Sequence, residues 1–211
     1  MPRRPPIDPE GTYHVSTRAN YGAPIFETTD HCEMYLRLFT KSVEEFGWVV
    51  LDWCLIWNHH HFLIRLTNGG LSEGMRKANH GFSRRMNAIG GQTNRGHLVR
   101  HGFHAGAIAS EAHLFQVCRY IAHNPVAAGL CARPEDWRWS GCRATLGLAH
   151  PRPFHAASEL LALFGPTPGS ARSAYRRHLQ DAPVSNGHDP FPGNGYESVT
   201  RAGARVVESQ A

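Results

Sequence analysis

Apolar and polar residues alternate near the start of the chain, which is the pattern of a half-buried β-strand. One set of alternate positions holds Tyr13, Val15 and Thr17, and the other holds His14, Ser16 and Arg18. Since successive side chains of a strand point to opposite faces, residues 12–18 are predicted to form the first strand.

Two further strands are predicted on either side of Asn58. Residues 48–57 are rich in β-branched, aromatic and other apolar side chains, which favours a buried strand. Asn58 suits a tight connection, and the strand that follows, residues 59–66, is closed by Asn68-Gly69-Gly70. The second and third strands are therefore predicted to be neighbours.

The third predicted strand divides its side chains between two faces. His59, His61, Leu63 and Arg65 belong to one face, and His60, Phe62, Ile64 and Leu66 to the other. His60 would then lie among core residues, where it needs either a hydrogen-bond partner or a position near the end of the sheet.

Longer segments carry apolar residues at helical spacing. They are residues 31–46, 71–87 and 111–123, with shorter helices at 155–164 and 170–180, while residues 97–109 are typical of a fourth extended segment. Asp30 is predicted to cap the first helix and Gly47 to end it. The third helix is predicted to end at Asn124, because proline disfavours helical geometry in the residue before it.

This order of elements, β α β β α β α, predicts an α+β fold. We expect a ferredoxin-like or RRM-like antiparallel sheet with helices on one face, the third strand in its centre, and a C-terminal helical extension. The predicted organisation is a basic flexible arm (1–10), a main domain (11–150), a basic helical extension (151–181) and a disordered tail (182–211).

Charge and composition indicate the class of partner. The 211 residues carry a formal net charge of +5, and Lys41 and Lys77 are the only lysines. Arginine has a planar fork that binds phosphate well, so the charge favours an anionic partner such as a nucleic acid. An arginine bias of the whole genome would give the same composition.

The five cysteines include no Cys-x-x-Cys pair, which argues against a structural zinc cluster and against a disulfide framework. No apolar run approaches 18 residues, and the proline-rich N-terminus lacks the apolar core of a signal peptide. We therefore expect a protein of the reducing cytosol.

Two histidines of the third strand are candidates for a metal site. His59 and His61 share a face, and two imidazoles aimed at one point can bind a metal. Three neighbouring histidines among the 15 in the chain can also arise by chance. Asn124 can supply a third ligand and leave positions open for an oxygen ligand such as a phosphate.

Tyr120 is the candidate nucleophile. It lies four residues before Asn124 and hence on the same face of the predicted helix, where its hydroxyl can stand beside a bound phosphate. Its phenol must lose a proton during attack, and the nearby Arg119 or His123 could help to stabilise the phenolate. Half-buried packing for Tyr120 and a helix end for Asn124 are the alternative interpretations.

Several short motifs follow one another along residues 11–147. They are Tyr13-His14-Val15, Asn58-His59-His60-His61-Phe62-Leu63-Ile64, Gly96-His97-Leu98, Arg119-Tyr120-Ile121, Asn124-Pro125-Val126 and Ala128-Gly129-Leu130. In this order they resemble the single-tyrosine HUH transposases of the IS200-like family, and in particular the REP-associated tyrosine transposases of bacteria. The main domain is accordingly expected to be the catalytic domain of such a transposase.

The resemblance implies metal-dependent cleavage of single-stranded DNA and strand transfer at REP-like hairpins, through a 5′-phosphotyrosine intermediate. It implies that Tyr120 attacks the DNA and that His59, His61 and Asn124 bind Mg²⁺ or Mn²⁺. The expected partners are single-stranded DNA and DNA hairpins, with no membrane, for a monomer or homodimer in the bacterial cytoplasm at the nucleoid.

Arginines and aromatic side chains are the residues expected to contact the DNA. The arginines are Arg3, Arg4, Arg18, Arg84, Arg85 and Arg119, and the aromatic candidates for base stacking are Trp57 and Phe103.

Three positions depart from the family pattern. His60 stands where an aliphatic residue is usual and could compete as a ligand in the wrong register. Trp57 replaces a proline or small residue, and Gly102 stands where arginine often precedes Phe103. None of them removes a predicted catalytic group.

Other functions fit parts of the same sequence. A non-catalytic protein that binds DNA or RNA hairpins could use the same scaffold, and the presence of Tyr120, His59 and His61 argues against it. A relaxase or replication initiator is disfavoured because the tyrosine follows the histidines and a helicase domain is absent. A plain zinc-binding protein is disfavoured by the lack of paired cysteines.

Overall fold

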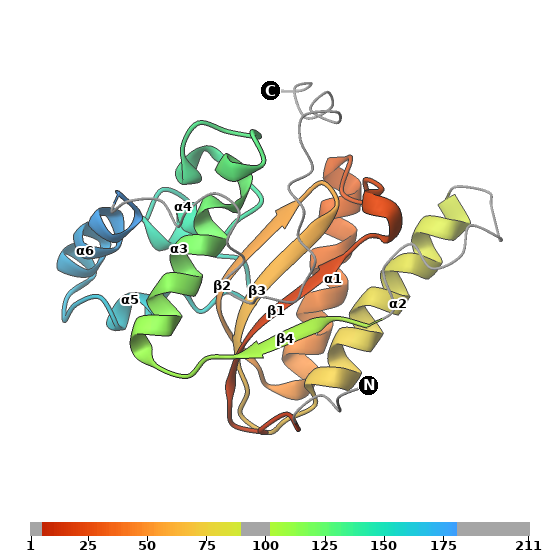
Figure 1. The fold of residues 1–211 in the computed structure, drawn as a ribbon, viewed down its shortest axis with the longest axis horizontal. Helices are drawn as coiled ribbons and strands as arrows, with labels where there is room; N and C mark the ends of the chain where they lie inside the picture. The colour runs from red at the N-terminus through yellow and green to blue at the C-terminus, as the bar shows by residue number, and fades with distance from the viewer. Residues whose placement is uncertain (1–5, 90–101, 181–211) are drawn as a thin grey trace.

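A computed structural model describes residues 6–89 and 102–180. Its strands are β1 Thr12–Arg18, β2 Val49–Ile56, β3 His59–Arg65 and β4 His104–Ala107. Its helices are α1 Thr29–Phe46, α2 Leu71–Ile89, α3 Glu111–Ala127, α4 Cys142–Thr145, α5 Ala157–Ala162 and α6 Pro168–Gln180, with 3₁₀ turns at Asn20–Gly22 and Pro134–Asp136. Figure 1 shows how these elements are arranged.

The four strands form one sheet in the order β2-β3-β1-β4, with every neighbouring pair antiparallel. This is the strand order of a ferredoxin-like sheet, so the predicted α+β class is confirmed. The histidine strand β3 lies inside the sheet, between β2 and β1, as predicted. Trp57 and Asn58 form the short connection between β2 and β3.

Most predicted boundaries agree with the structure to within two residues, but the first helix is capped differently. Thr28, not Asp30, is the N-cap of α1, because its hydroxyl oxygen accepts a hydrogen bond from the backbone N–H of His31 at 3.2 Å. Gly47 ends the helix as predicted, with a φ of +65° that glycine adopts without strain. Of the predicted extended segment 97–109, residues 97–101 lie outside the described residues, as does the predicted loop 90–96.

The helix predicted to end at Asn124 continues to Ala127 with Pro125 inside it. A proline at this point removes the N–H that would bond to the carbonyl of Ile121, and its side chain is buried. The turn is still closed by the N–H of Ala128, which donates to the carbonyl of Asn124 at 3.0 Å. The predicted end was therefore wrong, and Asn124 keeps the helical geometry that places it on the same face as Tyr120.

Helices cover both faces of the sheet. As expected, α1 and α2 share one face, where the ring of Phe39 stacks on Phe62 with centroids 3.8 Å apart. Helix α3 lies against the opposite face, on the side of β3 that carries His59 and His61 (Figure 1). The prediction of helices on one face thus holds for α1 and α2 but not for α3, and the site lies beneath α3.

His60 has the hydrogen-bond partner that its buried position requires. Its Nε2 lies 2.7 Å from the hydroxyl of Tyr35 on α1, and that hydroxyl donates to Asn79 on α2 at 2.9 Å. Asn79 in turn donates to Thr17 on β1 at 3.2 Å. This chain of polar contacts joins two helices to two strands on the face away from His59 and His61.

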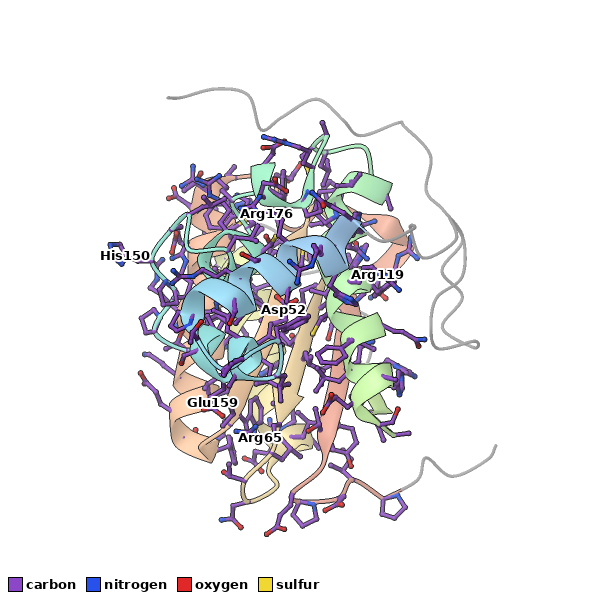
Figure 2. The ribbon with its side chains drawn as sticks, turned by 90° about the vertical axis from the view of Figure 1, so that its left-hand side faces the viewer. Asp52, Arg65, Arg119, His150, Glu159 and Arg176 are labelled. Carbon is purple, nitrogen blue, oxygen red and sulfur yellow. The ribbon has the colours of Figure 1, made fainter. Side chains whose placement is uncertain are left out.

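The C-terminal segments seal the outer edge of β2. The N–H of Leu55 donates to the carbonyl of Trp139, that of Gly141 to Trp53, and that of Ala156 to Val50, all at 2.8 to 2.9 Å. The apolar residues that this part adds to the core include Phe154, Leu160, Tyr175 and Leu179. Arg65 and Glu159 add an ion pair between β3 and α5 (Figure 2). Residues 134–180 therefore complete the same core as the sheet.

The predicted N-terminal arm is described only in part. Residues 6–10 contact the domain, because the carbonyl of Pro9 accepts from Gly69 at 2.8 Å and the N–H of Asp8 donates to the hydroxyl of Tyr13 at 2.6 Å. Arg3, Arg4 and the predicted tail 182–211 lie outside the described residues. Within residues 6–89 and 102–180, no helix has the length and apolar character needed to cross a membrane.

Candidate metal and nucleophile site

The two alternate histidines of β3 and the asparagine of α3 meet at one point. His59 Nε2 lies 3.1 Å from Asn124 Oδ1, and His61 Nε2 lies 3.2 Å from Asn124 Nδ2. Both imidazoles are buried, and Asn124 is half-buried. The structure therefore brings together all three residues predicted as metal ligands, although they come from segments far apart in the sequence.

Each of the two histidines is held through its other ring nitrogen. His59 Nδ1 lies 2.7 Å from Asn58 Oδ1, and Asn58 is itself oriented by donating from Nδ2 to the carbonyl of Gly22. His61 Nδ1 lies 2.8 Å from His14 Nε2. In metal sites such partners of the second nitrogen fix the tautomer and the orientation of the ligating ring.

Burial keeps these imidazoles neutral. It is the largest cause that lowers the pKa of His59 to about 3, with the nearby charge of Arg18 as a further cause. Burial likewise holds the pKa of His61 well below its usual value of 6.5, assisted by His59 and His14. A neutral imidazole offers one bare nitrogen lone pair, which is the form that binds a metal.

The donor atoms of His59 and Asn124 fit a divalent cation. Because Asn58 Oδ1 can only accept a hydrogen bond, His59 carries its proton on Nδ1, and its Nε2 lone pair faces the oxygen of Asn124. Two atoms that both accept hydrogen bonds are stable 3.1 Å apart when a cation binds both of them. The distance fits, because octahedral ligands about 2.1 Å from an ion lie about 3.0 Å apart when they are at right angles. Among the described residues no group of three His, Cys, Asp or Glu side chains could hold a metal, so the fit depends on the amide.

Tyr120 lies beside these groups on the same face of α3 as Asn124. Its ring meets the ring of His61 edge to face with centroids 5.3 Å apart, and it meets His14 in the same way at 5.8 Å. The tyrosine is half-buried rather than enclosed. The predicted nucleophile is thus next to the predicted ligands, on a side chain that solvent and substrate can reach.

The predicted DNA-binding arginines do not form one group. Arg18 ends β1 opposite His59 in the sheet register, beside the site. Arg84 and Arg85 are exposed on α2, across the sheet from α3. Arg119 lies on α3 next to the end of α6 (Figure 2), while Arg3 and Arg4 are outside the described residues.

His123, one of the two residues predicted to help stabilise the phenolate, contacts helix α6. His123 Nε2 bonds to the carbonyl of Leu179 on α6 at 2.9 Å, and His178 of α6 bonds to the carbonyl of Phe115 at 2.8 Å. Residues 115, 119 and 123 recur every four positions, so Arg119 lies on this α6-facing stripe too. At about 100° of turn per residue, the side chains of Arg119 and Tyr120 point to different sides of α3.

Two residues of the site, His14 and Asn58, were not predicted as partners of the histidines. The alternation in residues 12–18 already placed His14, Ser16 and Arg18 on one face. Only the pairing of β1 with β3, with Ser16 opposite His61, shows that this face is the one that carries the site. Asn58 had been assigned to the turn alone.

The three departures from the family pattern leave the site intact. His60 points to the α1 side and is bonded to Tyr35, so it does not compete for the position between His59 and His61. Gly102 has a φ of +84°, a conformation in which an arginine would be strained. Trp57 is half-buried, and its carbonyl accepts from both Ile25 and Phe26.

Two solved structures are similar to this chain to different degrees. One solved structure, a REP-associated tyrosine transposase bound to a REP hairpin, has a TM-score of 0.60 and 18% identity, covering 74% of this chain and 89% of that one. A putative transposase from Deinococcus radiodurans R1 has a TM-score of 0.41 and 15% identity, covering 57% and 95%. No curated protein matches the chain.

The first of these structures shares its fold with this chain. A family model described as "Transposase IS200 like" matches residues 9–124, which is more than half of the 211 residues and includes β1 to β4 and α3 as far as Asn124. The chain therefore belongs to the IS200-like transposase family.

Proposed function

We propose that this protein cleaves single-stranded DNA at REP-like hairpins and transfers the cut strand through a 5′-phosphotyrosine intermediate. The observation that carries the proposal is the meeting of His59, His61 and Asn124 beside Tyr120. His59 Nε2, His61 Nε2 and the amide oxygen of Asn124 would hold Mg²⁺ or Mn²⁺. When bound, such an ion supplies Lewis-acid polarisation of the scissile phosphate.

The covalent step belongs to Tyr120. Its hydroxyl oxygen forms a bond to phosphorus while the bond from phosphorus to the 3′ oxygen breaks, leaving DNA linked by its 5′ phosphate and a free 3′-OH. The phenol gives up its proton, and one proton is taken up by the departing 3′ oxygen. Attack by another 3′-OH reverses the step and joins a new strand, so no nucleotide cofactor is required.

Recognition of a DNA hairpin is supported by charge and by the family. The chain carries a formal net charge of +5, and the solved relative of the same fold binds a REP hairpin. Arg18 beside the site and the exposed Arg84 and Arg85 are the described arginines we propose for phosphate contacts. Arg119 lies on the side of α3 that faces α6, so it would contact DNA only at the edge of the interface between these two helices.

The cell compartment and assembly follow from the substrate. An enzyme acting on chromosomal hairpins would work in the bacterial cytoplasm at the nucleoid. We propose a monomer or a homodimer, and light scattering with and without a hairpin oligonucleotide distinguishes the two.

The proposal is tested by incubating the purified protein with labelled single-stranded hairpin oligonucleotides from its own flanking DNA and Mn²⁺ or Mg²⁺. Wild type should give a covalent protein–DNA adduct on a denaturing gel, and Tyr120→Phe should give none, because only the attacking oxygen is removed. Tyr175→Phe, a buried tyrosine on α6, is the matched control and should keep the adduct. An adduct with Tyr120→Phe contradicts the assigned nucleophile.

The same gel, combined with a mobility shift, tests the ligand role. His59→Ala should lose cleavage while keeping hairpin binding, since it removes one ligand and no phosphate contact. His80→Ala, on the exposed side of α2, should change neither. Hairpin binding by wild type without any adduct would instead support the non-catalytic hairpin-binding protein, and loss of binding by His59→Ala would indicate a structural histidine.

A further inference from the structure

His14 is a buried histidine that contacts both a predicted metal ligand and the predicted nucleophile. Its ring lies nearly parallel to that of His61, with centroids 5.0 Å apart and 13° between the planes. Its Nε2 lies 2.8 Å from His61 Nδ1, and its ring meets Tyr120 edge to face at 5.8 Å. It comes from β1, whereas His61 comes from β3 and Tyr120 from α3.

The contact between the two histidines can hold one proton in either of two ways. If His61 donates from Nδ1 to His14 Nε2, its own Nε2 is bare and can accept from Asn124 Nδ2, which lies 3.2 Å away. If His14 donates instead, the proton of His61 moves to Nε2, where it blocks the position that a cation would use. The surroundings of His61 Nε2 in the structure match the first arrangement.

We propose that His14 is a positioning residue that holds the proton of His61 on Nδ1 and thereby keeps His61 Nε2 open for the divalent cation. The inference rests on the proposed function and adds a residue to it. The ring of His14 also contacts that of Tyr120, which itself contacts His61 directly.

His59 shows the same arrangement with a different partner. There the proton on Nδ1 is held by Asn58 Oδ1 at 2.7 Å. Each predicted histidine ligand therefore has its own acceptor at the second ring nitrogen, one from the β2–β3 connection and one from β1. The two histidines therefore share a hydrogen-bond acceptor at Nδ1, which a side chain that only fills space would not supply.

The test is calorimetric titration of the metal-free full-length protein with Mn²⁺. His14→Leu fills similar space but cannot accept a hydrogen bond, and it should lower Mn²⁺ affinity by about 10- to 100-fold, as loss of such partners does in other sites. His14→Gln keeps an acceptor and should remain closer to wild type than His14→Leu. Val15→Ala, on the opposite face of β1 and fully buried, is the matched control. It should lower the melting temperature and leave Mn²⁺ affinity unchanged.

The outcomes separate this inference from the proposed function. If wild type binds Mn²⁺ and forms the DNA adduct but His14→Leu binds Mn²⁺ equally well, the inference about His14 is wrong and the proposed function stands. Equal losses in His14→Leu and His14→Gln also overturn it, since packing would then be the cause. Absence of Mn²⁺ binding by wild type overturns both.

A measurement on the wild-type protein covers the case in which the variants do not fold. With ¹⁵N-labelled histidine and saturating Mg²⁺, long-range proton–nitrogen correlations identify the nitrogen that carries the proton. The inference expects the proton of His61 on Nδ1, and a proton on Nε2 would contradict it.

Discussion

His59, His60 and His61 are consecutive in the chain but lie in two different environments. The outer two face α3 and meet Asn124, while the middle one faces α1 and bonds to Tyr35. The strand period of two made this division predictable from the sequence. The identity of the partners was not, because Tyr35 and Asn124 reach the strand only through the packing of helices on its two faces.

Asp52 is a buried carboxyl group that makes stability depend on pH above the range in which the buried histidines act. Its carboxylate is fully buried on β2 (Figure 2), and Oδ1 accepts from the N–H of Trp53 at 2.8 Å. Oδ2 has no hydrogen-bond partner among the described residues. Burial raises the pKa of Asp52 from 3.8 to about 7, and the Trp53 N–H only partly opposes it. The folded protein therefore prefers the protonated form.

We predict that Asp52→Asn stabilises the protein more at pH 8 than at pH 5. Since the folded pKa exceeds the unfolded one, the stability that Asp52 contributes is complete below about pH 4 and is lost as the pH rises through 7, by up to about 4 kcal/mol. Urea unfolding of both proteins at the two pH values measures the difference. Buried histidines lower the free energy of unfolding of both proteins equally below pH 6.5, so their effect cancels in the comparison. An equal stabilisation at both pH values would contradict the raised pKa of Asp52.

At the scale of elements, α2 packs closely against its neighbours at one glycine and less closely at another. A Cβ at Gly74 would lie 2.3 Å from the ring of Trp48, and its carbonyl accepts from Ser42 on α1 at 3.0 Å. A Cβ at Gly81 would lie 3.4 Å or more from Leu38, which is ordinary contact. The packing therefore requires glycine at position 74 of α2 but not at position 81.

Gly74→Ala should therefore destabilise the protein by about 1 to 3 kcal/mol through overpacking. Gly81→Ala should stabilise it by about 0.5 to 1 kcal/mol, because alanine is the better helix former and has room there. Chemical unfolding of the two variants checks this. The same sign of change in both would show that helix propensity, and not the approach to Trp48, determines the outcome.

Sequence periodicity predicted the elements better than it predicted their ends and contacts. β1 and the position of β3 followed from alternation, whereas α3 continues through Pro125 to Ala127, although proline disfavours a helix interior. The face of the sheet on which α3 lies depends on tertiary packing. So does the orientation of His123, whose bond to Leu179 involves a helix that begins 45 residues later in the chain.

At the scale of the whole molecule, the segment after α3 is part of the core. It lies outside the region matched by the family model, which ends at Asn124. It makes the backbone hydrogen bonds along the edge of β2. In addition, Arg152 donates to both carboxylate oxygens of Glu33, at 2.9 and 2.7 Å. The boundary predicted at residue 150 therefore cuts through contacts of a single unit.

We predict that a chain ending after residue 150 does not fold cooperatively. It lacks the bond from Ala156 to Val50 and the buried side chains of Phe154 and Tyr175, so a large apolar surface would face water. A chain ending after residue 180 is the control and should unfold in one transition near that of the full protein. Thermal unfolding followed by circular dichroism makes the comparison. Equal transitions in both chains would support an independent domain ending at 150.

The sealed edge of β2 also has a kinetic consequence. Its hydrogen bonds join Leu55 to Trp139 and Val50 to Ala156, so long stretches of chain must be brought together before these bonds form. Contacts of such high sequence separation carry a large loop-closure entropy and slow the folding transition. Until they form, β2 presents an unpaired edge to other chains. The newly made protein is thus most exposed to aggregation in the interval between sheet formation and the arrival of its last helices.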